Sequence, residues 1–326
     1  MMRSRMIAAL LALLLNPNSL WAQITKPIYV SLPGPGNVQH LAYAVAKEKK
    51  FYEEMGLSNV NIVVLRGNAM NVQALMSGSV HYSSAFGPSM QAMFKGEQIR
   101  VLLQIFSQIP FGLIVNPEIK RLEDLKGKKL AVTFGGSTYS VLQALLAKHG
   151  FNEKFAEYLN IPDNEGKAVA LVQGRAAGAL FAPPTDRPLL KASFKRLLYM
   201  GDEFKNIPFS ALQAMNKQVQ DEPEMTQRMV NAVLKALYWI RANREGAMDI
   251  IMKTGRLNER EIAASLYDLM RDAYIPSLSP EGLYKRAELE FAVLKENPNF
   301  KPEQFVDDRF YKAAVKLLAK EAGVKL

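Results

Sequence analysis

Short apolar segments alternate with amphipathic helical segments over residues 27–106, and this alternation restricts the possible fold more than any other feature of the chain. The segments expected as strand, helix, strand, helix, strand, helix and strand are, in order, 27–32, 41–49, 60–65, 69–76, 80–85, 90–96 and 100–106. Parallel strands joined by helices bury both faces of their sheet, so the pattern predicts an α/β fold with mostly parallel sheets flanked by helices. Ligands of such sheets bind beyond the carboxyl ends of the strands, where the turns 33–37, 66–68 and 86–88 are expected.

A second block begins near Phe111 and contains a stretch of glycine and hydroxyl residues, 133–140, with the sequence TFGGSTYS. An apolar run precedes it and leucines at helical spacing follow it, which predicts a strand, a glycine turn and a helix with Ser137 or Thr138 as N-cap. Free backbone N–H groups and the helix dipole at such a helix start favour an anion or the acceptor oxygen of a neutral ligand. An ordinary capped helix after a tight turn is the alternative interpretation.

The last third of the chain is predicted to be helical. Pro223 is expected to begin a long amphipathic helix that runs through Asn243, and its aromatic residues Tyr238 and Trp239 are interpreted as core rather than ligand contacts. Further helices are expected near 244–253, 258–273, 280–295 and 307–320.

The N-terminus has the features of an exported protein. Arg3 and Arg5 precede an apolar run of about ten residues, a break at Pro17 and a small residue at Ala22, which is typical of a secretory signal peptide. We expect this peptide to span residues 1–22. The apolar run is short for a bilayer span, although an N-terminal membrane anchor is the alternative. The chain has no cysteine, which suits a bacterial periplasmic protein and excludes disulfides, thiolate metal sites and cysteine nucleophiles.

Charge and histidine placement argue against several function classes. The formal net charge is +10, or +8 once Arg3 and Arg5 are removed with a signal peptide that contains no acidic residue. The lysines are scattered without a dense basic block, so nucleic-acid binding is not expected. The three histidines, His40, His81 and His149, fall in different predicted elements, and no Ser-His-Asp spacing or metal-ligand pair is recognisable. We therefore expect no catalytic residues, no metal site and no cofactor.

Two segments of the chain share a pattern. Residues 74–88 and 170–183 both contain Ala-Leu-x-x-Gly, then a short apolar run, then Phe, a small residue and Pro. Each predicts a helix, a glycine stop, a strand and a turn, although two common helix-to-strand joints could agree by coincidence. The pattern favours two similar α/β lobes with a cleft between them, an arrangement suited to ligand capture by hinge closure.

Three segments carry a resemblance to a known family, and they read YAVAKEKKFYEEMGL at 43–57, NVQALMSGSV at 71–80 and LEDLKGK at 122–128. In this order, behind an export signal, they resemble substrate-binding proteins of ABC transporters, in the group with receptors for nitrate, alkanesulfonates, taurine and thiamine-pyrimidine precursors. The resemblance covers most of the mature chain. It departs at His81, where the family commonly has Asp, and we interpret His81 as a strand residue at the end of the sheet.

The resemblance implies a type II-like periplasmic binding protein with two α/β lobes and a ligand cleft between them. Two crossings between the lobes are expected, near 106–110 and 201–209. Lobe 1 would comprise residues 23–106 and 208–326, the latter supplying a return strand and C-terminal helices, and lobe 2 residues 107–207.

The resemblance also implies that turns from both lobes contact the ligand. The expected ligand-binding residues are Gly36, Asn37, Arg66, Gly67, Asn68, Phe86, Gly87, Gln108, Gly136, Ser137, Thr138, Pro183 and Thr185. Arg66 could pair with an anionic ligand or be a solvated turn residue. No inward-pointing cluster of Arg or Lys is recognisable, so a small organic molecule with one acidic or polar end is as compatible as a sulfonate or nitrate.

The expected function is that of a monomeric, periplasmic solute-binding protein. It would capture a sulfonate, a carboxylate, nitrate or a pyrimidine-like molecule by hinge closure and deliver it to the membrane permease of an ABC transporter. A ligand sensor or adaptor for a signalling partner is the alternative. An enzyme on the same fold is a minor alternative, because related pyrimidine synthases carry a cysteine-rich iron motif that this chain lacks.

Overall fold

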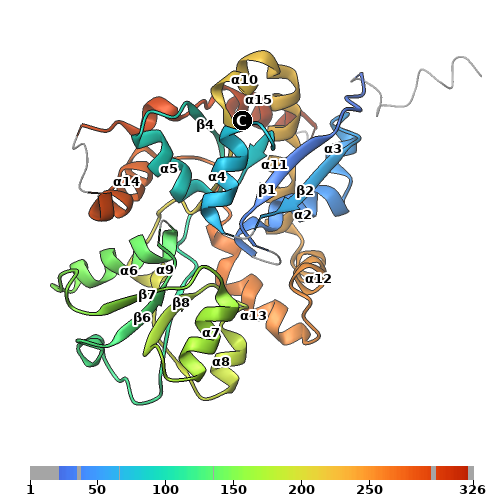
Figure 1. The fold of residues 1–326 in the computed structure, drawn as a ribbon. Helices are drawn as coiled ribbons and strands as arrows, with labels where there is room; N and C mark the ends of the chain where they lie inside the picture. The colour runs from blue at the N-terminus through green and yellow to red at the C-terminus, as the bar shows by residue number, and fades with distance from the viewer. Residues whose placement is uncertain (1–21, 35–37, 66, 135, 295–298, 322–326) are drawn as a thin grey trace, which may run out of the picture.

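The chain folds into two α/β lobes, each built around a five-stranded sheet (Figure 1). The computed structural model describes residues 22–34, 38–65, 67–134, 136–294 and 299–321. The chain leaves the first sheet after strand β4 (Ile99–Phe106) and returns to it at β10 (Ser210–Met215). Residues 1–21 of the predicted signal peptide lie outside the described residues. The lobe boundaries expected at 106/107 and 207/208 stay predictions.

The first sheet has four strands in one direction and one strand against them. Its spatial order is β2 (Val60–Val64), β1 (Ile28–Leu32), β3 (Tyr82–Ser83), β10 and β4. Strands β1, β2 and β3 pair in parallel, and β10 is antiparallel to both β3 and β4. The return strand therefore lies inside the sheet, because it fills the place between two strands that come from the N-terminal third of the chain.

The second sheet repeats this arrangement. Its spatial order is β7 (Glu157–Asn160), β6 (Lys129–Val132), β8 (Gly178–Phe181), β5 (Gly112–Val115) and β9 (Lys195–Tyr199). Strand β5 is antiparallel to both of its neighbours, and β6 is parallel to β7 and β8. The predicted mostly parallel sheets are confirmed, each with one antiparallel strand.

The shared sequence pattern corresponds to equivalent places in the two sheets. Gly78 and Gly174 follow the helices α4 (Asn68–Met76) and α7 (Asn164–Val172), and both have positive φ values, +73° and +68°, which glycine adopts without strain. The strands that follow them, β3 and β8, both lie third in their sheets. The two Phe-x-Pro segments differ, because Phe181 ends β8 whereas Phe86 begins the helix α5 (Phe86–Phe94). The turn predicted at 86–88 is therefore wrong; these residues form the first helical turn.

Helices cover both sheets. In lobe 1 they are η1 (Val38–His40), α2 (Leu41–Glu48), α3 (Phe51–Glu54), α4, α5, α10 (Asn216–Asp221), α11 (Pro223–Ala242), α12 (Arg244–Gly255), α13 (Arg260–Met270), η3 (Arg271–Ala273), α14 (Pro280–Leu294), η4 (Pro302–Phe305) and α15 (Arg309–Glu321). In lobe 2 they are η2 (Leu122–Leu125), α6 (Ser137–Lys148), α7, α8 (Arg187–Lys191) and α9 (Met200–Glu203). None of the described helices has both the length and the apolar composition needed to cross a membrane.

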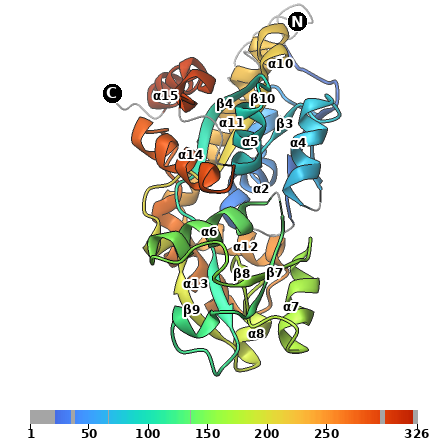
Figure 2. The ribbon, with the colours of Figure 1, turned by 60° about the vertical axis from the view of Figure 1, so that its left-hand side comes forward.

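The cores follow from the apolar periodicity. On α11, Met229, Val233 and Leu237 recur every four residues and are fully buried against α2 and the first sheet. In lobe 2, successive residues of β5 such as Leu113 and Ile114 are both fully buried, because helices cover both faces of the sheet. The C-terminal helices mostly pack on lobe 1 as predicted, but α14 contacts both α5 of lobe 1 and α6 of lobe 2 (Figure 2).

Candidate functional site

A cleft of about 580 Å³ lies between the two lobes and takes its walls from both. The polar residues of its lobe 1 wall include Gln39, His40 and Ser84. Those of its lobe 2 wall include Thr133, Ser137, Thr138, Asn160 and Lys167. Phe86, Phe111 and Phe209 add apolar surface. Apolar walls with a few convergent polar groups are typical of a small-molecule site.

The structure brings together seven of the thirteen residues expected to bind ligand. Those that line the cleft are Gly67, Phe86, Gly87, Gly136, Ser137, Thr138 and Thr185. Gly36, Asn37 and Arg66, and the side chain of Asn68, lie outside what the structure describes. Gln108 and Pro183 are not among the described residues that line the cleft. Gln108 instead accepts a hydrogen bond from the hydroxyl of Tyr199 at 3.5 Å. Ligand contact by the seven stays a prediction.

The start of α6 forms one wall of the cleft. The predicted N-cap at Ser137 or Thr138 is wrong, because Gly136 is the N-cap and no side chain caps the helix. The two hydroxyl groups have other partners: Thr138 Oγ1 accepts the backbone N–H of Thr133 at 3.4 Å, and Ser137 Oγ accepts a hydrogen bond from Arg286 at 3.3 Å. Residues 136–138 therefore present the positive end of the helix dipole to the cleft.

Behind this wall lies a buried ion pair that the sequence analysis missed. Arg286 and Glu290 of α14 are both fully buried and form an ion pair one helical turn apart. Glu290 also accepts hydrogen bonds from Ser140 Oγ at 3.0 Å and from Gln91 Nε2 at 2.6 Å. There is no room for a side chain at Gly87, because a Cβ atom there would lie 1.8 Å from Arg286 Nη2. Spacing of Arg and Glu at i, i+4 is common on exposed helices, so the sequence gives no sign of this burial.

His40 was not expected in the site, yet it lines the cleft from η1. Its side chain is buried, and burial lowers its pKa to about 3, so the imidazole is neutral at pH 7. Neither ring nitrogen has a hydrogen-bond partner among the described residues. A buried neutral imidazole offers one donor and one acceptor. His81, in contrast, lies outside the cleft lining and directly precedes β3, so its interpretation as a strand residue is wrong; its Nδ1 accepts the Tyr29 N–H at 3.1 Å.

Lys167 is a cationic residue of the cleft that the sequence analysis did not single out. It lies on α7, lines the cleft and has only 2% of its surface exposed. Burial lowers its pKa to about 8, an effect that the carboxylates of Asp163 and Glu165 partly offset. Its place on a helix with apolar neighbours gave no signal in the sequence, because only the packing of α7 beside β6 turns this face toward the cleft.

The architecture is that of a two-lobed binding protein, and comparison with known proteins identifies its family. A family model described as NMT1/THI5 like matches residues 37–247. The chain therefore belongs to the NMT1/THI5-like family.

A relative from Brucella abortus (strain 2308), named "Putative binding protein", is 28% identical over 220 residues, which cover 64% of this chain. The match spans 66% of that relative, just under two thirds of its length.

Solved structures share the fold at low identity. The alkanesulfonate-binding protein SsuA from Xanthomonas axonopodis pv. citri, bound to MOPS, superposes with a TM-score of 0.75 at 16% identity, covering 88% of this chain and 100% of SsuA. The periplasmic nitrate-binding protein NrtA from Synechocystis PCC 6803 superposes with a TM-score of 0.74 at 14% identity, covering 91% of this chain and 90% of NrtA. The chain thus has the periplasmic-binding-protein fold of these solute binders.

Proposed function

We propose that this protein is a periplasmic solute-binding protein that captures a small polar or anionic organic molecule between its lobes and delivers it to the permease of an ABC transporter. The observation that carries the proposal is the cleft of about 580 Å³, whose polar residues come from both lobes. A solute that contacts both walls binds the closed arrangement more tightly than the open one, and this difference in affinity drives closure.

The relatives support this class of function. SsuA and NrtA are named for binding alkanesulfonates and nitrate, and the Brucella relative is named as a binding protein. By analogy with SsuA and NrtA, the solute would be a sulfonate or nitrate; a carboxylate or a pyrimidine-like molecule also falls within the proposal. The protein would be a monomer exported by the signal peptide at residues 1–22. The lobes would be residues 23–106 with 208–326, and 107–207.

Binding without catalysis agrees with the chemistry of the site. His40 carries a pKa lowered to about 3 by burial, which makes it a poor proton acceptor at neutral pH. His149 pairs with Glu203 at 3.4 Å, and neither is among the described residues that line the cleft. We propose that the cleft holds its solute unchanged.

Isothermal titration calorimetry on the mature protein tests the proposal. The probes are ethanesulfonate, benzenesulfonate, benzoate, nitrate and uracil, and we expect at least one to bind with a micromolar or lower Kd. The double variant Ser137→Ala/Thr138→Ala is expected to weaken that binding at least about tenfold, since each hydroxyl offers a hydrogen bond from the α6 wall. Small-angle scattering should show a smaller radius of gyration with the bound probe.

The matched control is Ser77→Ala, which removes an exposed hydroxyl at the end of α4, away from the cleft. It should bind like the wild type. Binding of no probe by the wild type would count against a solute-binding function, whereas unchanged affinity in the double variant would remove the α6 wall from the site.

A further inference from the structure

Lys167 places a buried cation in the wall of the cleft, one turn into α7. The N-cap residue Asp163 accepts the backbone N–H of Gly166 at 2.6 Å, which anchors this turn of the helix. Lys167 Nζ donates a hydrogen bond to Thr133 Oγ1 at 3.3 Å, and that hydroxyl donates in turn to the carbonyl oxygen of Ile161 at 3.0 Å. The ammonium group therefore has a neutral partner that is itself held in place.

The charge of Lys167 is not compensated by an ion pair within the described chain. The carboxylates of Asp163 and Glu165 act on Lys167 only at longer range. Asp163 caps α7, and Glu165 is exposed to solvent. Arg286, the buried cation behind the neighbouring wall, already has Glu290 as its partner. A buried ammonium with three donors and one neutral acceptor is costly to hold, which indicates a missing anionic partner.

The start of α6 lies beside Lys167 and adds to the positive potential. Thr133, which accepts from Lys167, is joined to the α6 turn by two contacts: its carbonyl oxygen accepts the Gly136 N–H at 3.1 Å, and its own N–H donates to Thr138 Oγ1 at 3.4 Å. The α6 helix is twelve residues long and lacks a side-chain cap. Its dipole and the ammonium group thus act on the same part of the cleft.

The lobe 1 wall of the same cleft contains unpartnered polar atoms. Both ring nitrogens of His40 and the Oε1 atom of Gln39 are buried without a hydrogen-bond partner among the described residues. Buried polar groups are almost always paired, so these atoms point to a bound molecule with its own polar groups. The lobe 2 wall of the cleft therefore holds a buried ammonium group near the carboxylates of Asp163 and Glu165, and the lobe 1 wall offers neutral donors and acceptors.

We propose that Lys167 is the specificity-determining residue of the cleft, which binds the oxyanion of a carboxylate or sulfonate while His40 and Gln39 hold the neutral polar end of the same solute. This inference rests on the proposed function, since it assigns the class of solute that the cleft takes. It ranks an acid above its neutral amide, because only the acid brings a charge opposite to that of the ammonium group.

Binding of an anion has a protonation consequence. The titratable groups that line the cleft are His40 from lobe 1 and Asp163, Glu165 and Lys167 from lobe 2. His40 stays neutral between pH 7 and 9.5, whereas burial lowers the pKa of Lys167 to about 8. An anion raises the pKa of Lys167 again, so binding at pH 8.5 takes up protons and affinity falls as pH rises above 8.

The test compares benzoate and benzenesulfonate with benzamide by isothermal titration calorimetry, for the wild type, Lys167→Met and Lys154→Met. Methionine preserves most of the apolar volume of lysine, and Lys154 is an exposed lysine of lobe 2 that serves as the matched control. We expect the wild type and Lys154→Met to bind an acid at least about tenfold more tightly than benzamide. Lys167→Met should bind the acid at least about tenfold more weakly than the wild type does, whereas its affinity for benzamide should equal that of the wild type.

Proton uptake is the second readout. Titrations at pH 8.5 in buffers of different ionisation enthalpy should show net proton uptake for the wild type and none for Lys167→Met. Thermal melts check that the variant is folded, and its melting temperature should equal or exceed that of the wild type because a buried charge is removed.

The outcomes separate the inference from the function on which it rests. Equal acid affinity and equal proton uptake in Lys167→Met and the wild type would overturn the role of Lys167 and leave solute binding intact. A wild type that binds benzamide more tightly than benzoate and benzenesulfonate would also overturn the role of Lys167 and leave solute binding intact. A wild type that binds neither these probes nor the wider panel of sulfonates, nitrate and uracil would reject solute binding first, and the inference with it.

Discussion

The hydroxyl of Ser140 donates a hydrogen bond to Glu290 Oε2 across 3.0 Å, and this contact ties α6 of lobe 2 to helix α14. The same carboxylate accepts from Gln91 of α5 in lobe 1 and pairs with Arg286. One buried side chain thus links three helices from distant parts of the chain, directly behind the wall of the cleft.

Replacing Glu290 with Gln should strongly destabilise the protein. The change preserves the shape of the side chain but leaves the buried guanidinium of Arg286 without a counter-charge, which costs about 3–5 kcal/mol. Urea denaturation measures the loss. Ser140→Ala, which removes one hydrogen bond to the carboxylate, should cost about 1.5–3 kcal/mol. Stability of the Gln variant equal to that of the wild type would show that Arg286 finds another partner.

Gly87→Ala should lower both stability and affinity. The added Cβ would lie 1.8 Å from Arg286 Nη2 and 2.8 Å from Ser137 Oγ, so the guanidinium must move away from the cleft wall. Overpacking of this kind costs about 1–3 kcal/mol. Denaturation and calorimetry on the same preparation measure the two effects. A variant with wild-type stability and affinity would mean that the α5 and α14 helices separate easily at this point.

His40→Asn should make the protein more resistant to acid. The folded-state pKa of about 3 lies below the unfolded value of 6.5, so the unfolded chain binds the extra proton first as pH falls. The contribution of neutral His40 to the free energy of unfolding is complete above pH 6.5 and is lost as pH falls toward 3. The loss is on the order of 4–5 kcal/mol. Denaturation between pH 7 and 4 should show a shallower decline in the variant. A decline in the variant as steep as that of the wild type would contradict a buried neutral His40.

Lys167→Met should stabilise the protein at neutral pH. The folded-state pKa of about 8 lies below the usual lysine value of 10.5, so the protonated lysine opposes folding below pH 8, by on the order of 3 kcal/mol. This penalty disappears as pH rises from 8 to 10.5, and the gap between variant and wild type should close over the same range. Denaturation at pH 7 and 9.5 measures the gap. A variant less stable than the wild type at pH 7 would contradict an uncompensated charge.

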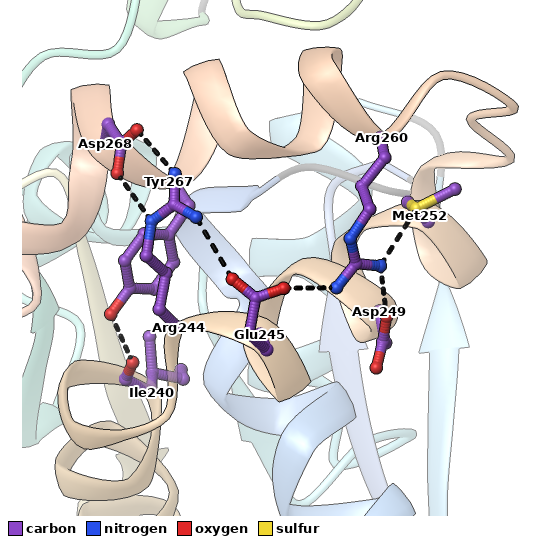
Figure 3. Close-up of polar contacts among 8 residues, drawn as sticks. All are labelled: Ile240, Arg244, Glu245, Asp249, Met252, Arg260, Tyr267 and Asp268. Atoms are coloured by element: carbon purple, nitrogen blue, oxygen red, sulfur yellow. Dashed lines mark hydrogen bonds and ion pairs between the residues drawn. The ribbon is translucent and has the colours of Figure 1, made fainter.

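Arg260→Gln should have a small, salt-dependent effect. Arg260 and Arg244 join α12 and α13 through ion pairs with Glu245, Asp249 and Asp268 on the surface of lobe 1 (Figure 3). Exposed pairs are screened by salt and lose side-chain entropy on forming, so the melting temperature should stay within about 2 °C of the wild type. Any difference at 0.1 M salt should vanish at 1 M. A larger loss that persists at 1 M salt would contradict a screened surface network.

Much of the fold was predictable because it depends on local patterns. The alternation of apolar and helical segments predicted an α/β fold with mostly parallel sheets, and the C-terminal helices were predicted close to their observed bounds. The pattern shared by residues 74–88 and 170–183 predicted two lobes built alike, and Gly78 and Gly174 occupy matching places in them.

The cleft was predictable only where backbone turns build it. Gly67 and residues 136–138 line it from a turn and a helix start, whereas Phe86 and Gly87 line it from the first turn of α5 and not from the predicted turn. Two cleft residues were missed: the buried cation Lys167 and His40, whose ring nitrogens lack partners among the described residues. Each lies on a helix, and the local sequence does not show which side of that helix faces the cleft. Gln108 was expected in the cleft from the resemblance, but it accepts a hydrogen bond from Tyr199 and is not among the described residues that line the cleft.

The sequence by itself determined the strands, the helices and the glycine corners, since these depend on apolar spacing and on backbone freedom within a few residues. Only the tertiary structure decided that β10 enters the first sheet antiparallel, that Arg286 and Glu290 are buried behind Gly87, and that Lys167 faces the cleft. These features join segments far apart in the chain, and their energies come from burial and charge pairing, which no local stretch of sequence specifies.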